Sequence, residues 1–99
     1  MPLARKLLLL KSEDVTRPLA PATTVLEDDE LEVLRLIAKK PLLDRPTVRE
    51  VVYAIAALGG HLKQNGAPGW QTLARGWERL SAVLEGYRLG RKLEAEPPG

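Results

Sequence analysis

Apolar side chains recur with heptad spacing towards the end of the chain. They follow one another at intervals of three and four residues, which places them at the a and d positions of about two and a half heptads. This spacing predicts a long helix from about residue 70 to about residue 93 that packs along one seam. The residues of the seam are Trp70, Leu73, Trp77, Leu80, Leu84 and Tyr87.

Two capping signals predict two shorter helices upstream. Thr24 stands three residues before Glu27, which opens an acidic run, so we expect a helix from about Thr24 that Pro41 stops. Thr47 and Glu50 form a second capping box, and a row of apolar residues at helical spacing follows it. That row consists of Val48, Val51, Val52, Ile55, Leu58 and Leu62, and Gly59 and Gly60 either end the helix or meet another backbone.

The two ends of the chain are expected to lie outside this bundle. Residues 1–11 form a leucine-rich helical stub with little to bury against, and residues 12–23 hold two prolines and read as a linker. A loop is expected over 63–69, and 94–99 reads as a disordered tail. The sequence therefore predicts an all-α domain of three principal helices over 24–93, with a long C-terminal helix.

Composition excludes several classes of protein. With no cysteine, the chain has neither a disulfide framework nor thiolate metal ligands, and it suits a reducing cytoplasm. The apolar run from Leu7 to Leu10 is too short for a secretory signal, so we expect a cytoplasmic protein. The net charge of +2 is far below what sequence-independent duplex binding needs. Residues 27–50 carry five basic and seven acidic side chains and are the acidic part of the chain.

No arrangement of polar residues predicts catalysis, a cofactor or a metal. His61 is the only histidine and reads as a surface residue near a loop. The four carboxylates of residues 27–30 point about 100° apart in succession, so they favour a solvated helix start over a cation site. The glycines form no phosphate-binding loop. We therefore expect a chain that is not an enzyme.

Glycines inside the long helix indicate a second contact face. Each costs about 1 kcal/mol relative to alanine, so each needs a reason. One interpretation is a small-residue strip that lets a second helix approach; the other is that Gly76 accommodates a neighbour inside one subunit. The candidate dimer interface is Gly76, Val83, Gly86 and Gly90, bordered by Leu80 and Tyr87, and the candidate core is Val51, Val52, Ile55, Leu58, Trp70, Leu73, Trp77 and Leu84.

Three short motifs lie between residues 58 and 80. Their residues are Leu58, Gly59, Gly60 and Leu62, then Pro68, Gly69 and Trp70, then Thr72, Leu73, Arg75, Gly76, Trp77 and Leu80. Together they resemble the carboxy-terminal dimerisation domain of bacterial cut-and-paste transposases of the Tn-five type, in the insertion-sequence-four family. His61 departs from the pattern, which usually has phenylalanine there. The resemblance covers about 24–93, and residues 1–11 are similar to the end of the family's catalytic core.

The resemblance implies a non-catalytic module through which two transposase subunits hold two transposon ends together. The family's Asp, Asp, Glu triad and its Tyr, Arg, Glu, Lys signature do not occur in this chain. The implied partner is a second copy or a full-length transposase, with DNA met only through the parent protein. A fragment, a remnant and an inhibitor acting through mixed dimers are all compatible with this. The alternative is a small DNA-binding accessory domain using Arg75, Arg79, Arg88, Arg91 and Lys92.

Overall fold

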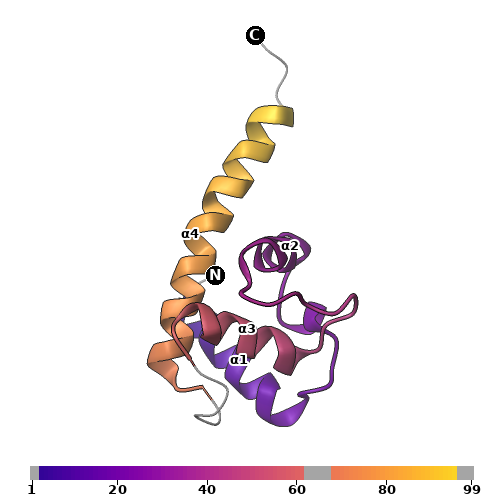
Figure 1. The fold of residues 1–99 in the computed structure, drawn as a ribbon, viewed down its shortest axis with the longest axis vertical. Helices are drawn as coiled ribbons and strands as arrows, with labels where there is room; N and C mark the ends of the chain where they lie inside the picture. Colours follow the sequence, from indigo (N-terminus) through magenta and orange to yellow (C-terminus); the bar gives the residue numbers. More distant parts are fainter. Residues whose placement is uncertain (1–2, 62–67, 96–99) are drawn as a thin grey trace.

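The computed structural model describes residues 3–61 and 68–95, and in these residues the chain is all-α, as the sequence predicted. Figure 1 shows the earlier helices gathered into a body, while the last helix runs along that body and projects well beyond it. The molecule is accordingly elongated, with extents of 52 × 25 × 24 Å. The helices are α1 (Leu3–Thr16), α2 (Asp28–Ile37), α3 (Val48–Leu58) and α4 (Trp70–Ala95), with a short 3-10 helix, η1 (Ala22–Thr24).

The packing of α3 against α4 forms the centre of the core. The hydroxyl of Thr47 caps α3 by accepting a hydrogen bond from the backbone N–H of Glu50 (3.2 Å), which confirms the predicted start. Val48 to Ile55 present one apolar face, and the N-terminal half of α4 covers it. The buried residues of the two helices are Val48, Val51, Val52, Ile55, Ala56, Leu58, Leu73, Trp77, Leu80 and Leu84.

The N-terminal segment is part of this core, contrary to the predicted stub and linker. Residues 12–16 continue α1, which ends only near Pro18, and Ala22 of η1 is buried. Leu7 and Leu10 pack into the same core as α3 and α4. Asp14 accepts a hydrogen bond from Arg49 of α3 (3.0 Å), so an ion pair adds to the apolar contact. The predicted linker is therefore wrong at residues 12–16 and 22–23, which are helical. The predicted stub is wrong in having nothing to bury against, because Leu7 and Leu10 are covered within this chain.

The second helix begins later than its sequence signal indicated. Thr24 lies in η1, and α2 begins at Asp28 with Glu27 as its capping residue. The N–H of Glu27 donates to the Glu30 carboxylate (2.7 Å), and this contact replaces the expected cap by Thr24. The helix ends at Ile37, so Lys39 lies beyond it. Several polar residues in a row could cap this helix. Val25 and Leu26 are buried in the core, and the helix begins after them, at Asp28.

Trp70 is 49% exposed, so its predicted place in the core is wrong. Trp70 lies within about 20° of buried Trp77 on the helix, but it is the first residue of α4, at the edge of the packed surface. Its ring lies instead 5.1 Å from the Nζ of Lys11 on α1. The heptad pattern predicts the helix correctly and assigns its first residue to the wrong environment.

Other sequence predictions fall on parts of the chain that are not described. The predicted loop over 63–69 falls largely on residues 62–67, which lie outside the described residues, as does Leu62. Of the predicted tail, Glu94 and Ala95 belong to α4, and 96–99 lie outside the described residues. Within 3–61 and 68–95, none of the helices is long and apolar enough for a membrane crossing.

Candidate dimerisation surface

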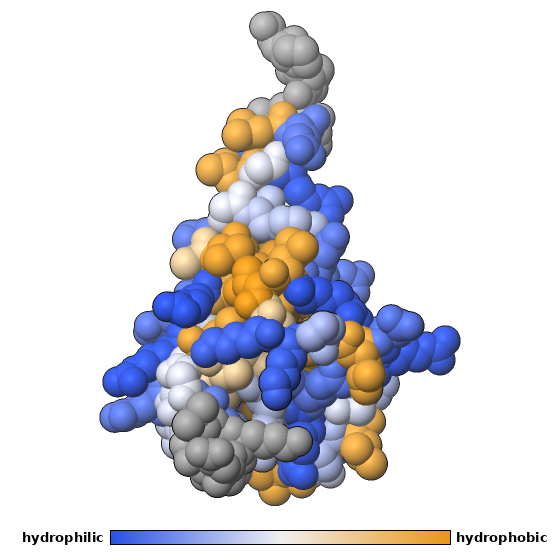
Figure 2. Space-filling model, viewed as in Figure 1, coloured by the Kyte–Doolittle hydropathy of each residue, from blue (hydrophilic) through white to orange (hydrophobic). Residues whose placement is uncertain are grey.

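The two halves of α4 have different surroundings. From Leu73 to Leu84 the helix packs on α1, α2 and α3, and Leu73 and Leu80 are fully buried. Beyond Leu84, Tyr87 and Arg88 still contact α2 on one flank, and the rest of the helix projects from the body, where Figure 2 shows apolar surface. We call residues 70–84 the packed half of α4 and residues 85–95 its free half.

Gly76 lies in the packed half, where the backbones of α3 and α4 come into contact. A Cβ built on Gly76 would meet the carbonyl oxygen of Ile55 at 1.7 Å, and one on Gly59 would meet that of Thr72 at 2.1 Å. Any side chain at either position would push the two helices apart. The structure therefore selects the alternative in which Gly76 serves packing within one subunit.

Two of the residues proposed for the interface are consequently unavailable to a partner. Gly76 is enclosed by α3, and Leu80 is fully buried in the core. Both were assigned to the interface from their position on a helical projection. Such a projection gives the direction of a side chain but does not show which element packs against it.

The remaining small residues lie on an exposed strip that begins at the end of the packed half and continues along the free half. No described atom lies within 4 Å of a Cβ built on Gly86 or on Gly90. Val83 is 40% exposed, and two leucines that the sequence reasoning missed, Leu89 and Leu93, are 58% and 63% exposed. At about 100° per residue these five residues fall within an arc of about 120°. We call them the free strip: Val83, Gly86, Leu89, Gly90 and Leu93.

Both leucines could have been found from the sequence. Leu89 follows Gly86 by three residues and Leu93 by seven, the spacing at which side chains share a helix face. Neither leucine belongs to the heptad seam, whose last member is Tyr87. An apolar strip beside the seam is the signal that identifies a second contact face.

Polar contacts with α2 hold the helix in place at the base of the free half. The Tyr87 hydroxyl donates to Glu32 (2.6 Å), and the Arg88 guanidinium donates to Asp29 and to Glu27 (3.1 Å). The hydrogen bond from Arg88 lowers the pKa of the Asp29 carboxyl, although partial desolvation opposes it. The same bond raises the pKa of Arg88. Tyr87 and Arg88 lie about 100° and 160° around the helix from Gly86, so their contacts fix the helix without covering that glycine.

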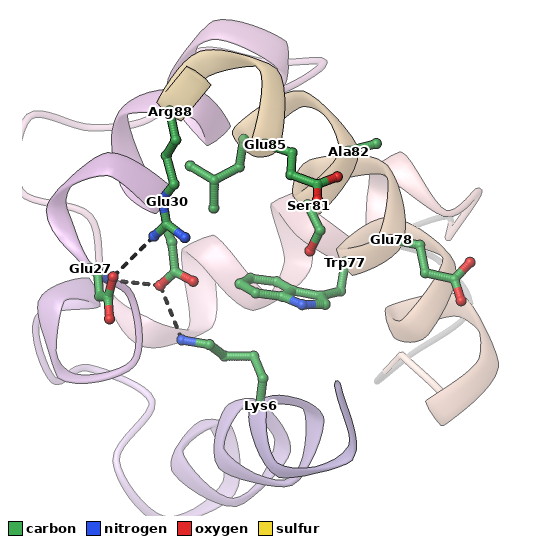
Figure 3. A pocket seen from close by; sticks show the side chains of 10 residues that line it. Lys6, Glu27, Glu30, Trp77, Glu78, Ser81, Ala82, Glu85 and Arg88 are labelled. Carbon is green, nitrogen blue, oxygen red and sulfur yellow. Dashed lines mark hydrogen bonds and ion pairs between the residues drawn. The ribbon is translucent and has the colours of Figure 1, made fainter. Parts of the chain in front are cut away.

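A second polar cluster lies beneath this one, in a cleft of about 530 Å³ between α1, α2 and α4. Lys6 is buried and donates to the Glu30 carboxylate and to the carbonyl of Val25, both at 3.0 Å. Its Nζ also lies 5.2 Å from the centre of the Trp77 ring. Figure 3 shows the ion pair from Lys6 to Glu30 and that from Arg88 to Glu27 in the same cleft. The sequence reasoning missed this pair, whose signal was a lysine within a leucine run.

The side chains singled out for possible chemistry have structural contacts instead. Three of the four carboxylates at residues 27–30 pair with Lys6 or Arg88, and Asp28 is exposed. His61 is half-buried, with its ring edge-on to Tyr53 at 5.9 Å between centroids. Within the described residues, no three side chains of the metal-binding types come together.

Comparison with known proteins gives one result that bears on this surface. The protein family described as "Transposase Tn5 dimerisation domain" matches residues 3–96. No curated protein matches the chain. The family match includes α1 as well as α4, in agreement with the packing of α1 into the core.

Proposed function

The chain belongs to the family of Tn5 transposase dimerisation domains, and from this we propose that the free strip of α4 pairs two copies about a two-fold axis. A two-fold interface uses the same patch on both subunits, so the strip would face its own copy. The observation that carries the proposal is that an apolar face with two open glycines lies on the one helix end that projects from the body.

The residue spacing favours a particular crossing of the two helices. Ala82, Gly86 and Gly90 follow one another at intervals of four, and Val83 and Leu89 flank this row. Rows at this interval interdigitate best when helices cross at about −50°, and small residues in the row allow a close approach. The leucines on either side would then close over the crossing point and exclude water. We therefore expect the two bodies to lie on opposite sides of a crossed helix pair.

The test is sedimentation of the chain over a wide concentration series. We expect a dimer for the unchanged chain and a monomer for Gly86→Leu, because the larger side chain would separate the helices at their crossing. Lys92→Leu is the matched control, since it adds the same side chain to the same free half at a position about 120° around the helix from Gly86. A Gly86→Leu chain that is folded and dimerises as tightly as the parent would sink the assignment, as would a parent that is monomeric throughout.

DNA binding by α4 itself is less well supported than dimerisation. Of the basic residues considered for it, Arg88 is paired with Asp29 and Glu27, and Arg91 donates to the Tyr87 hydroxyl (3.3 Å). The hydrogen bond from Arg91 also raises the pKa of that guanidinium. Binding DNA through Arg88 would require breaking contacts that hold α4 on α2, and binding through Arg91 would compete with a contact inside α4.

A second candidate function follows from the same surface. These 99 residues match the family's dimerisation domain and hold neither of its catalytic signatures, so this chain, paired through the free strip with a full-length transposase, would contribute no catalytic residues to the mixed dimer. We expect co-expression of the chain to lower transposition frequency, and the Gly86→Leu chain to have no effect. An unchanged frequency with both proteins present at comparable levels would contradict this role.

A further inference from the structure

Within residues 27–50, the acidic side chains and the basic side chains gather in two different places, which we call the acidic end and the basic end. Five carboxylates fall between Glu27 and Glu32 at the start of α2, and four cations with one carboxylate fall between Arg35 and Arg45. Four of the five carboxylates lie in or next to the first turn of α2, whereas Lys39, Lys40 and Arg45 lie beyond its last residue, Ile37, so the length of α2, about 15 Å, lies between them. This separation exceeds the screening length of about 8 Å at physiological ionic strength, so the acidic end does not neutralise the basic one. The net charge of this segment therefore conceals a local excess of positive charge.

The cations of the basic end have no carboxylate partners. Lys39, Lys40 and Arg45 are exposed, and Arg35 donates to the backbone carbonyl of Asp44 (2.9 Å). In the described part of the chain, none of these four residues forms an ion pair. At the acidic end, by contrast, Lys6 and Arg88 occupy most of the carboxylates. The positive charge left over is therefore available to a partner.

The loop that carries these cations has a defined shape. The N–H of Leu43 donates to the Glu50 carboxylate (2.7 Å), and Pro46 accepts a hydrogen bond from the N–H of Ala22 (2.9 Å). The bond from Arg35 to Asp44 closes the loop back onto α2. Figure 2 shows hydrophilic side chains projecting at the edge where Figure 1 places the connection between α2 and α3. Because the loop is held at both ends, ordering it on binding costs little entropy.

We propose that Lys39, Lys40 and Arg45 form a contact surface for the phosphate backbone of duplex DNA. Mobile lysines and a guanidinium on an ordered loop suit phosphates, which are bound through charge and without base reading. Duplex DNA is the polyanion that a subunit of a transposase dimer meets, whereas an acidic protein would need a matching arrangement of carboxylates. This surface is separate from the free strip, so it does not depend on the dimer.

The test is the affinity of the chain for a labelled duplex of arbitrary sequence, measured by fluorescence anisotropy as the salt concentration is raised. Three phosphate contacts give a slope of log affinity against log salt of about −2.7. We expect the variant Lys39→Gln, Lys40→Gln, Arg45→Gln to lose at least about tenfold in affinity at about 50 mM salt, together with most of that slope. The control Arg75→Gln, Arg79→Gln, Lys92→Gln removes the same charge from α4.

The control is expected to change the affinity by less than about twofold. If both triple variants lose the same affinity for the duplex, the effect comes from net charge alone and the proposal is overturned. A larger loss of affinity in the control overturns it as well. Exposed Leu36 and Leu43 flank the cations, so the chain is also mixed with vesicles of anionic lipid. Vesicle binding without duplex binding, or no duplex binding at up to roughly 1 mM protein, overturns it as well. Sedimentation of each variant separates these outcomes from any change in dimerisation.

Discussion

The two halves of α4 use the same residue types for opposite purposes. In the packed half, Gly76 brings the helix against the carbonyl of Ile55, and the leucines are buried around it. In the free half, Gly86 is open to solvent, and the leucines beside it are more than half exposed. The difference shows that a glycine inside a helix marks a close contact without indicating whether the partner belongs to the same chain. Only the position of the body relative to the helix separates the two cases.

The largest expected effect is the contrast between one substitution made in each half. Gly76→Leu places a side chain where the Ile55 carbonyl already lies, and we expect a loss of about 5 kcal/mol or more, enough to unfold a small domain. Gly86→Leu meets no described atom and replaces a poor helix former, so the monomer should gain roughly 0.5–1 kcal/mol. Urea titration followed by circular dichroism measures both.

Similar losses of stability in Gly76→Leu and Gly86→Leu would contradict the division of α4 into a packed and a free half. A stable Gly76→Leu chain would mean that α3 and α4 can separate without cost. An unstable Gly86→Leu monomer would mean that Gly86 contacts the body, in which case the free strip would no longer be free.

A smaller contrast concerns the two tryptophans of the packed half. Trp77 is 7% exposed and lies over the Lys6 ammonium, so Trp77→Ala should cost about 3–5 kcal/mol. Trp70→Ala removes a half-exposed ring and one contact with Lys11, and should cost less than about 1 kcal/mol. Thermal unfolding of the two variants in the same buffer compares their losses of stability. Comparable losses would place Trp70 in the core, as the heptad pattern alone suggests.

Periodicity and capping residues predicted much of the fold. The heptad seam identified α4, and Thr47 with Glu50 identified the start of α3. They did not predict the role of α1, because its apolar residues mark a buried face without showing what covers it. Its buried charges, Lys6 and Asp14, depend on Glu30 and Arg49, which lie 24 and 35 residues away in the chain. Pairings at that distance leave no local pattern in the sequence.

The candidate surface could be predicted only in part, for a related reason. Val83, Gly86 and Gly90 were assigned to an exposed strip from their direction on the helix, and the structure leaves all three exposed. Gly76 and Leu80 were assigned by the same argument, and α3 covers the first while the core encloses the second. The end of the body falls near Leu84, and no feature of the α4 sequence marks it. A helical projection predicts faces and cannot predict where along a helix the packing stops.

The smallest expected effect is at the junction of the two halves, where Arg88 ties α4 to Asp29. The hydrogen bond from Arg88 lowers the pKa of the Asp29 carboxyl below its usual value of about 3.9. A carboxyl with a lowered folded-state pKa stabilises the fold fully above the unfolded value, and this contribution is lost as pH falls through the folded value. Because half of the Arg88 side chain is exposed, the contact should contribute less than about 1 kcal/mol.

A double-mutant cycle isolates this contact from the other effects of each residue. Asp29→Asn, Arg88→Gln and the double variant are compared with the parent by urea titration between about pH 7 and pH 3. We expect a coupling energy that is constant from about pH 7 to pH 5 and that decreases as the pH falls below the unfolded value of about 3.9. Asp29 also faces the helix dipole at the start of α2, and this contribution cancels in the cycle because Arg88→Gln leaves it in place. A coupling of zero at pH 7 would show that the other contacts between α2 and α4, without this ion pair, fix where the free half of α4 begins.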